Sequence, residues 1–324
     1  MRCRNLLLLA GLGLCPTMSY ALACSVTNVQ SINFGTVNPL STSSSSTSMT
    51  FGYSCTRGVL DGLLTAVTLC FNIGASSNSG QVTTRTMANT LTSSNTLSYQ
   101  LYQGTSSGTV WGSQFVAGTT PAMVNLSSLV VGVPSTGSLT VAAVLPLPQI
   151  SAIPGSFQDI YSSATAIVTS NTGLLVPPGS CGTTVATTFA FNVLATVAKQ
   201  CTVTPNGNIS MGSVNSTATN TTSSNTLSVA CSNGTAYTVG LVPSNSSTTG
   251  SGVMVTSPSN GDQVPYQLSS TAGPNGTVWG SASTNQVAGT GNGSATSYTV
   301  YATVPSANYT PGNYADTVTV NVTY

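Results

Sequence analysis

The chain repeats itself at the scale of a domain, and this duplication constrains its fold more than any other feature. Cys-Ser-Val-Thr at 24–27, with Asn-Phe-Gly-Thr-Val-Asn at 33–38, returns as Cys-Thr-Val-Thr at 201–204 with Ser-Met-Gly-Ser-Val-Asn at 210–215. Three later segments recur in the same order: 99–101 with 266–268, 108–113 with 276–281, and 154–159 with 311–316. Two copies with different interiors predict tandem domains, because a solenoid needs a shorter period and more copies. We expect domain 1 at 24–199 and domain 2 at 200–324.

Both copies consist of short segments in which apolar and polar residues alternate, separated by Gly, Pro, Asn and Ser. No stretch combines a helical period with helix caps. The composition, 40% hydrophobic and only 3% charged, favours packed β-structure over disorder. Short strands at regular spacing predict an all-β chain of two tandem immunoglobulin-like β-sandwiches.

Residues 1–23 have the pattern of a secretory signal peptide. Arg2 and Arg4 precede the apolar run 6–14, and Ala-Leu-Ala at 21–23 fits a cleavage site before Cys24. The apolar run is too short for a membrane anchor. A lipoprotein is the other alternative, but Ala21 stands where a lipoprotein signal prefers Leu. The sequence therefore predicts export.

Six cysteines follow the predicted signal peptide, and an even count in an exported chain indicates disulfides. Cys24 and Cys55 have almost the same separation as Cys201 and Cys231, so the duplication pairs each set within its own domain. Cys70 and Cys181 remain as the third pair.

The chain ends on a strand pattern. Val318, Val320, Val322 and Tyr324 alternate with polar residues up to the last position, and no returning strand follows them. We interpret this segment as an edge strand whose free side is a template for another chain. The alternative is an edge covered by a loop from elsewhere in the chain.

Together, the paired cysteines, the Asn-Phe-Gly motif, Tyr-Gln-Leu followed by Val-Trp-Gly, and the terminal Gly-Asn-Tyr-Ala-Asp-Thr-Val-Thr-Val resemble the spore coat U domain. This family builds subunits of archaic chaperone–usher pili. The resemblance covers nearly all of both copies and implies an incomplete immunoglobulin-like fold. The missing last strand would come first from a periplasmic chaperone and then from the N-terminal extension of the next subunit. An outer-membrane usher is the third partner that the resemblance implies.

Three departures from this pattern predict a subunit at the pilus tip. The expected mature chain begins at Cys24, and so carries no donor segment ahead of its first cysteine. A donor-like segment lies instead inside the chain, within 188–198, and we expect it to complete domain 1 in cis. Its apolar face consists of Phe189, Phe191, Val193, Ala195 and Val197. Read without the resemblance, this segment is simply the last strand of a closed sandwich. Domain 2 has no such segment after it and would stay open, able to accept a strand but not to give one.

Domain 1 is longer than domain 2 and carries four apolar inserts, at 57–64, 121–137, 145–154 and 171–179. In an immunoglobulin-like sandwich the first and last of these lie at the end away from domain 2. The third insert in chain order (145–154) should face domain 2, and 121–137 could join the far end. Loops are normally polar, so these are either extra core or a binding surface. We interpret them as a surface that binds host or abiotic surfaces, through Val59, Leu60, Leu63, Leu64, Val130, Val131, Leu174, Leu175 and Val176.

Other classes of function fit poorly. Neither His nor Glu occurs and the few Asp are scattered, so the chain predicts no enzyme, metal site or cofactor. Five basic residues give no footprint for nucleic acid. The expected function is a pilus tip adhesin at the cell surface, exported through the periplasm, that promotes attachment and biofilm formation. One alternative is a carbohydrate-binding tip that stacks sugars on Trp111, Tyr99, Tyr102 or Tyr161. Another is a purely structural pilus or coat subunit.

Overall fold

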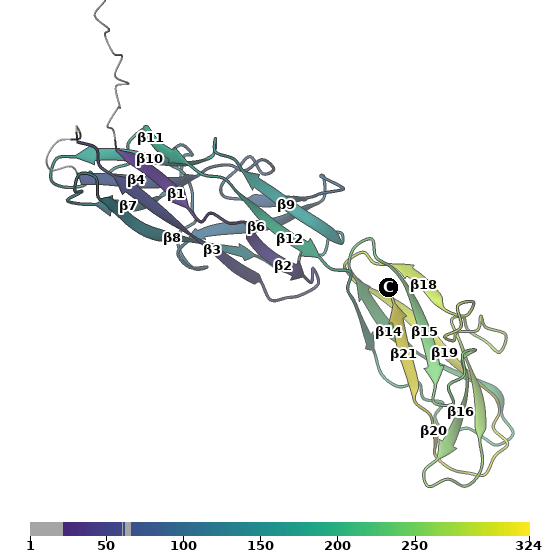
Figure 1. Ribbon diagram of the computed structural model, residues 1–324. Helices are drawn as coiled ribbons and strands as arrows, with labels where there is room; N and C mark the ends of the chain where they lie inside the picture. The colour runs from purple at the N-terminus through teal and green to yellow at the C-terminus, as the bar shows by residue number, and fades with distance from the viewer. Residues whose placement is uncertain (1–21, 60, 62–65) are drawn as a thin grey trace, which may run out of the picture.

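The computed structural model describes residues 22–59, 61 and 66–324, and Figure 1 shows them as two β-sandwiches joined end to end. Every regular element in this part of the chain is a β-strand, which confirms the predicted all-β fold class. The described residues contain no helix that could cross a membrane. The predicted signal peptide lies outside the described residues, apart from Leu22 and Ala23.

Domain 1 forms an eight-stranded sheet in the order β1-β3-β8-β6-β5-β9-β12-β2, packed on a four-stranded sheet in the order β11-β10-β4-β7. The strands are β1 (Ala23–Thr27), β2 (Ile32–Val37), β3 (Ser45–Thr56), β4 (Ala66–Ile73), β5 (Arg85–Asn89), β6 (Thr96–Gln103), β7 (Ala122–Leu126), β8 (Pro134–Leu145), β9 (Gly155–Tyr161), β10 (Ala166–Gly173), β11 (Thr184–Thr188) and β12 (Phe191–Val197).

Domain 2 repeats the arrangement with fewer strands. Its larger sheet has the order β13-β14-β19-β17-β16-β20, and its smaller sheet has the order β18-β15-β21. The strands are β13 (Cys201–Pro205), β14 (Thr219–Cys231), β15 (Ala236–Pro243), β16 (Ser251–Thr256), β17 (Val264–Ser269), β18 (Val287–Thr290), β19 (Ala295–Ser306), β20 (Tyr314–Ala315) and β21 (Val318–Thr323).

One buried tryptophan marks the same place in each core. The indole N–H of Trp111 donates to the carbonyl of Phe71 (2.7 Å), and that of Trp279 donates to the carbonyl of Val239 (2.8 Å). Both rings are almost fully buried, as expected for residues that belong to a duplicated core. A buried indole needs a hydrogen-bond acceptor, and the same strand supplies one in each copy.

Each domain has its own hydrophobic cluster, and the two clusters share no residue. Disulfides join the three predicted pairs, Cys24–Cys55, Cys70–Cys181 and Cys201–Cys231. No disulfide therefore connects domain 1 to domain 2 among these cysteines.

The predicted cis segment is the last part of domain 1. β12 runs antiparallel to β9 on one side and parallel to β2 on the other. β11, just before it, runs antiparallel to β10 in the other sheet. The alternating face predicted from the sequence is buried, since Phe189, Phe191, Val193, Ala195 and Val197 are at most 5% exposed. Residues 184–197 thus contribute a strand to each sheet of domain 1: β11 at the edge of the smaller sheet, and β12 between β9 and β2 in the larger.

Candidate functional site

A groove runs along domain 2 at the place that β12 fills in domain 1. The counterpart of β2 by sequence, residues 209–214, forms no strand, and the counterpart of β9 is reduced to the two residues of β20. Between them lies a groove of about 750 Å³. Its apolar lining includes Ile209, Met211, Met254, Val264, Leu268, Val304, Tyr309 and Tyr314.

Equivalent residues of the two domains differ in how deeply their side chains are buried. Ile32 and Val37 in β2 are 0% and 4% exposed, because β12 lies beside them. Their counterparts in domain 2 are more accessible: Ile209 is half-buried and Val214 is 37% exposed. Domain 2 thus has side chains suited to a core without the strand that covers them in domain 1.

A tyrosine–aspartate pair lies at the same position in both domains. The Tyr99 hydroxyl donates to the Asp159 carboxylate (2.5 Å), and the Tyr266 hydroxyl donates to the Asp316 carboxylate (2.6 Å). Burial is the main factor that raises the pKa of both tyrosines, and the neighbouring carboxylate raises it further. Asp159 is 1% exposed, whereas Asp316 is half-buried and lines the groove. The pair in domain 2 is therefore already formed at the wall of the groove.

Domain 1 adds to this pair a buried cation that domain 2 lacks. Arg85 is fully buried, donates to the carbonyls of Trp111 (2.7 Å) and Ile73 (3.2 Å), and lies 5.8 Å from the Tyr161 ring centroid. Strand pairing places Arg85 opposite Tyr99 and places Gly252 opposite Tyr266. The groove of domain 2 therefore has no guanidinium at this position.

The C-terminal strand also leaves one side free. β21 pairs with β15, and no described strand pairs with its other edge. Its counterpart β10 has β11 on that edge. Val318, Val320 and Val322 are half-buried against the core, while Tyr324 is 49% exposed. The free edge lies where the alternation predicts an edge strand. The sequence did not reveal the groove, because its wall at 209–214 has the same apolar pattern as β2 and yet forms no strand.

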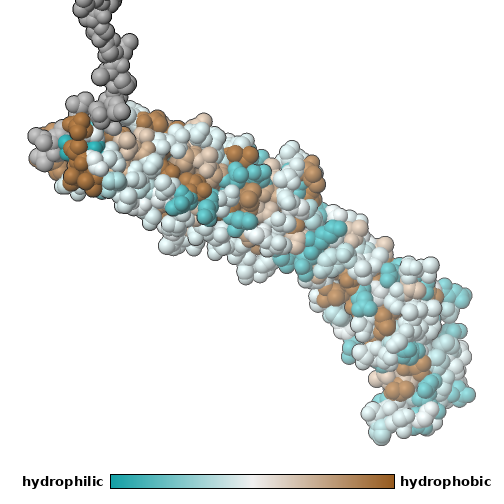
Figure 2. All heavy atoms as spheres, in the orientation of Figure 1, coloured by the Kyte–Doolittle hydropathy of each residue, from teal (hydrophilic) through white to brown (hydrophobic). Residues whose placement is uncertain are grey.

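Three loops meet at the end of domain 1 that lies away from domain 2. In the register of the smaller sheet, Gly173 at the end of β10 lies opposite Ala66 at the start of β4, and Val67 lies opposite Leu126 at the end of β7. The loops that precede β4 and follow β7 and β10 therefore emerge at one place, and Figure 2 shows patches of brown, apolar residues at this end. We call residues 57–59, 127–133 and 174–183 the tip loops.

All six of the predicted surface residues that the structure describes are exposed there. The exposed fractions are 62% for Val59, 59% for Val130, 39% for Val131, 78% for Leu174, 63% for Leu175 and 73% for Val176. Leu60, Leu63 and Leu64 lie outside the described residues. Val133, which belongs to the insert at 121–137, is also 54% exposed at this end. Part of that insert therefore reaches the tip.

Arg57 connects two of the tip loops from below. Its guanidinium donates to the carbonyl of Leu129 (3.0 Å), and its own carbonyl accepts from the backbone N–H of Gly132 (3.0 Å). The side chain is 4% exposed, so the charge does not reach the surface. Arg57 therefore supports the valines at 130 and 131 without making the tip polar.

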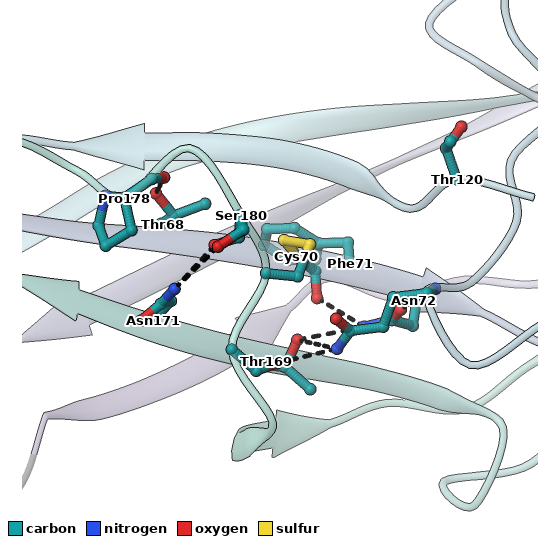
Figure 3. Close-up of a disulfide and its surroundings, with 12 residues drawn as sticks. Thr68, Cys70, Phe71, Asn72, Thr120, Thr169, Asn171, Pro178 and Ser180 are labelled. Atoms are coloured by element: carbon teal, nitrogen blue, oxygen red, sulfur yellow. Dashed lines mark hydrogen bonds between the residues drawn. A yellow bond between two sulfur atoms is a disulfide. The ribbon is translucent and has the colours of Figure 1, made fainter.

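The third tip loop is fixed across the outer face of the smaller sheet. Cys181 is bonded to Cys70 of β4, and the Thr68 hydroxyl donates to the carbonyl of Pro178 (2.5 Å). The Asn171 amide donates to the carbonyl of Ser180 (3.0 Å). Figure 3 shows these contacts on one side of the ribbon around Cys70. The disulfide and these hydrogen bonds hold the base of the loop, while residues 174–176 project from it.

The remaining predicted residues do not join the tip. Trp111, Tyr99 and Tyr161 are at most 3% exposed, so they offer no stacking face for a sugar; Tyr102 is half-buried. The insert at 145–154 lies at the opposite end of domain 1, where the Asn233 amide of domain 2 donates to the carbonyl of Ser151 (2.9 Å).

The fold and these sites together define a protein of two immunoglobulin-like sandwiches, one closed by its own last strand and one with a groove in its place. A family model describes the same chain: the Spore Coat Protein U domain matches residues 14–162 and again 187–321. The chain belongs to this family. The second match begins at 187, so it includes β12 together with domain 2. No curated protein matches the chain.

Solved structures resemble this fold. The CsuC–CsuE chaperone–tip adhesion subunit pre-assembly complex from the archaic chaperone-usher Csu pili of Acinetobacter baumannii matches with a TM-score of 0.54 and 17% identity. That match covers 93% of this chain and 100% of the other. The CupB6 tip adhesin of Pseudomonas aeruginosa is more distant, with a TM-score of 0.38 and 11% identity over 93% of this chain and 94% of the other.

Proposed function

We propose that this protein is the tip adhesin subunit of a pilus assembled by the chaperone–usher pathway. The observation that carries the proposal is the asymmetry between the two domains. Residues 184–197 fill the groove of domain 1, and no described segment fills the equivalent groove of domain 2. A subunit with one closed and one accepting domain fits the end of a fibre. Family membership and the fold of the solved tip adhesin support the same role.

The occupant of the domain 2 groove is, in this proposal, an extended strand from another polypeptide. Domain 1 supplies the template for its orientation, because β12 runs antiparallel to β9 and β11 runs antiparallel to β10. The incoming strand would run antiparallel to β20 and β21, so that its first part pairs with the free edge of β21. Backbone hydrogen bonds then provide affinity and alternate side chains provide register.

The duplication also suggests which residues of the incoming strand would lie opposite which residues of domain 2. Phe191, Val193 and Ala195 lie opposite Tyr161, Asp159 and Phe157 in domain 1. By sequence these positions correspond to Val318, Asp316 and Tyr314 in domain 2. The donor residue opposite Tyr314 should be as small as Ala195. The groove wall there is a tyrosine whose hydroxyl is held by the Asn260 amide (2.9 Å) and by its own bond to the Thr310 carbonyl (2.7 Å).

The proposed partners follow from the order of assembly. A periplasmic chaperone would occupy the groove first, guide the subunit to an outer-membrane usher, and be replaced by the N-terminal strand of the next subunit. Burial of the half-exposed apolar lining would stabilise each complex, since apolar area removed from water contributes roughly 25 cal/mol per Å². The expected location is the tip of a pilus at the cell surface.

Adhesion would take place at the tip loops. Val59, Val130, Leu174, Leu175 and Val176 project from loops whose bases are fixed by Arg57 and by the Cys70–Cys181 disulfide. A fixed apolar surface of this kind suits hydrophobic host or abiotic surfaces, and attachment through many pili would support biofilm formation.

A self-complemented chain tests the accepting groove. A second copy of residues 184–197 is appended after Tyr324 through a flexible linker of about ten residues, as long as the connection from β10 to β11. The midpoint of thermal unfolding of domain 2 should rise by about 10 °C or more, because binding to the folded state alone stabilises it. The fused chain should also fail to enter pili.

The matched control is the same fusion with Phe191 and Val193 of the appended copy replaced by aspartate. These two side chains lie on the buried face of β12. Aspartate there would place unpaired charges in the groove, so this fusion should not stabilise domain 2. Equal stability of both fusions and the unmodified chain would contradict an accepting groove.

A further inference from the structure

The two domains meet through a second contact besides the polypeptide link. The link itself is short: β12 ends at Val197 and β13 begins at Cys201. At the same junction, a loop of domain 1 between β8 and β9 reaches domain 2 (Figure 1). We call residues 146–153 the joint loop.

Domain 1 holds the joint loop in a fixed conformation. The Gln149 backbone N–H donates to the carbonyl of Pro39 (3.0 Å), and its side-chain amide donates to the carbonyl of Ser98 (2.8 Å). The backbone N–H of Ser98 donates back to the Gln149 side chain (2.7 Å). The Asn95 side chain accepts from the backbone N–H of Ile153 (3.1 Å). The loop is therefore an extension of the rigid sandwich.

One carbonyl of the joint loop accepts from both domains. The Ser151 oxygen takes the Asn95 amide of domain 1 at 3.0 Å and the Asn233 amide of domain 2 at 2.9 Å. A carbonyl oxygen has two lone pairs, so both bonds can form at once. Asn233 lies in the turn between β14 and β15, next to Ser232.

Two glycines of domain 2 lie beside the joint loop. Gly293 has a φ of 81°, and a Cβ there would lie 2.3 Å from the Ile150 oxygen. Gly234 has a φ of 75°, and a Cβ there would be in van der Waals contact with Ile153, at 3.9 Å. At Gly293, the backbone of domain 2 thus lies too close to the joint loop for any side chain.

The polypeptide link is fixed as well. The backbone N–H of Gln200 donates to the Ser232 hydroxyl (2.7 Å), which in turn donates to the carbonyl of Ala198 (3.1 Å). The backbone N–H of Ala198 donates to the carbonyl of Val37 in domain 1 (3.0 Å). Ser232 is fully buried and follows Cys231, whose disulfide joins it to Cys201 at the start of domain 2. Each side of Lys199 is therefore bonded to a rigid element.

We propose that the joint loop and this bonded link form a lock that holds the two domains as one rigid body and protects the Lys199–Gln200 peptide bond from proteases. A single short link would allow the domains to swing, which is the usual behaviour of domains with small interfaces. A second attachment beside it opposes bending about the link. Proteolysis requires an extended, accessible segment, which residues 198–200 can provide only when the lock opens.

Selective proteolysis can test the lock, because Lys199 is the only lysine in the chain. A lysine-specific endoproteinase can cut the full chain at this single bond. The products separate on a denaturing gel without reduction, since each disulfide lies wholly on one side of residue 199. The rate of cleavage therefore reports on opening of the lock.

Two variants open the lock by different means: Asn233→Ala removes the donor to Ser151, and Gly293→Ala inserts a Cβ against Ile150. Gly273→Ala is the matched control, because Gly273 also has a positive φ, of 97°, but nothing lies within 4 Å of its Cβ position. Loss of this exposed hydrogen bond should speed cleavage about two- to fivefold, and the collision should speed it by at least about tenfold. The control should be cut at the rate of the unmodified chain.

Circular dichroism melts separate this effect from general unfolding, since Asn233→Ala should leave the melting of both domains unchanged. Small-angle X-ray scattering should give a broader distribution of interatomic distances for both lock variants. Equal cleavage rates in all four proteins would overturn the lock. This result would leave the accepting groove untouched, because none of the four chains differs in the groove lining.

Discussion

At the scale of single residues, a few buried polar groups decide how each domain behaves. Tyr99 lies between Asp159 and Tyr161, bonded to the first at 2.5 Å and to the second at 2.8 Å, with Arg85 beyond the Tyr161 ring. Both hydroxyls are buried, and neither can lose its proton without placing a new negative charge beside Asp159. The network therefore favours neutral tyrosines.

This network predicts that the protein loses stability in alkali. Burial raises the pKa of Tyr161 to about 12, above its ordinary value of about 10. A raised pKa in the folded state gives stability that is complete below about pH 10 and is lost as pH rises toward 12. The loss assigned to Tyr161 is about 2–3 kcal/mol. Denaturant titrations of domain 1 between pH 8 and 12 measure it.

Tyr161→Phe is the variant that isolates the effect. It keeps the ring that stacks on Phe191 at 4.6 Å and removes only the hydroxyl. Its stability should fall less steeply above pH 10 than that of the unmodified chain. Parallel slopes for the two proteins would show that Tyr161 is not the group responsible.

At the scale of elements, alternation and cysteine spacing were enough to predict much of the fold. The face of Phe189, Phe191 and Val193 is buried as expected, and β21 has the free edge that its alternation suggested. Other features had no sequence signal. Arg57 looked like any loop arginine, and only the fold places it under Leu129. Nor does the sequence show that 209–214 forms no strand, since these residues repeat the pattern of β2 and differ from it only in lacking a neighbouring strand like β12.

The Cys70–Cys181 disulfide belongs to this scale, because it fixes one loop to one strand. Replacing both cysteines by serine should cost about 2–5 kcal/mol of stability in domain 1, the usual effect of removing a native disulfide. It should also free residues 174–176 and weaken attachment. Thermal unfolding and a surface-attachment assay of piliated cells measure the two effects.

The cysteine pair of domain 2 provides the control for this prediction. Cys201→Ser with Cys231→Ser removes a disulfide that lies far from the tip loops. Chains with this change that still reach the pilus should attach normally. If both double variants attach equally well, the position of loop 174–183 does not govern attachment.

At the scale of the whole molecule, the two domains present different kinds of surface. The tip loops present apolar side chains on fixed bases, and the groove and free edge lie in the other domain, across a junction with two attachments. In the proposed function, this arrangement separates assembly from adhesion. It predicts that each can be removed without the other.

Replacing Leu174, Leu175 and Val176 by serine tests this separation. Each apolar side chain buried in a contact contributes roughly 1.5–3 kcal/mol, so attachment to a hydrophobic surface should fall by at least about tenfold. Pilus number should be unchanged, because these side chains are 63–78% exposed and contact neither the core nor the groove. Counting pili by electron microscopy and attached cells on polystyrene gives both quantities from the same culture.

Leu91→Ser is the matched control, since Leu91 is 92% exposed and lies in the turn between β5 and β6, outside the tip loops. An adhesive surface confined to the tip predicts that this change, although it removes the most exposed large apolar side chain described, leaves attachment intact. Equal losses in the two variants would mean that exposed apolar area anywhere on domain 1 promotes attachment. Only a loss of attachment that is specific to the variant at 174–176 supports a dedicated binding surface at the tip loops. We expect that surface to depend on the loop bases that Arg57 and Cys181 hold in place.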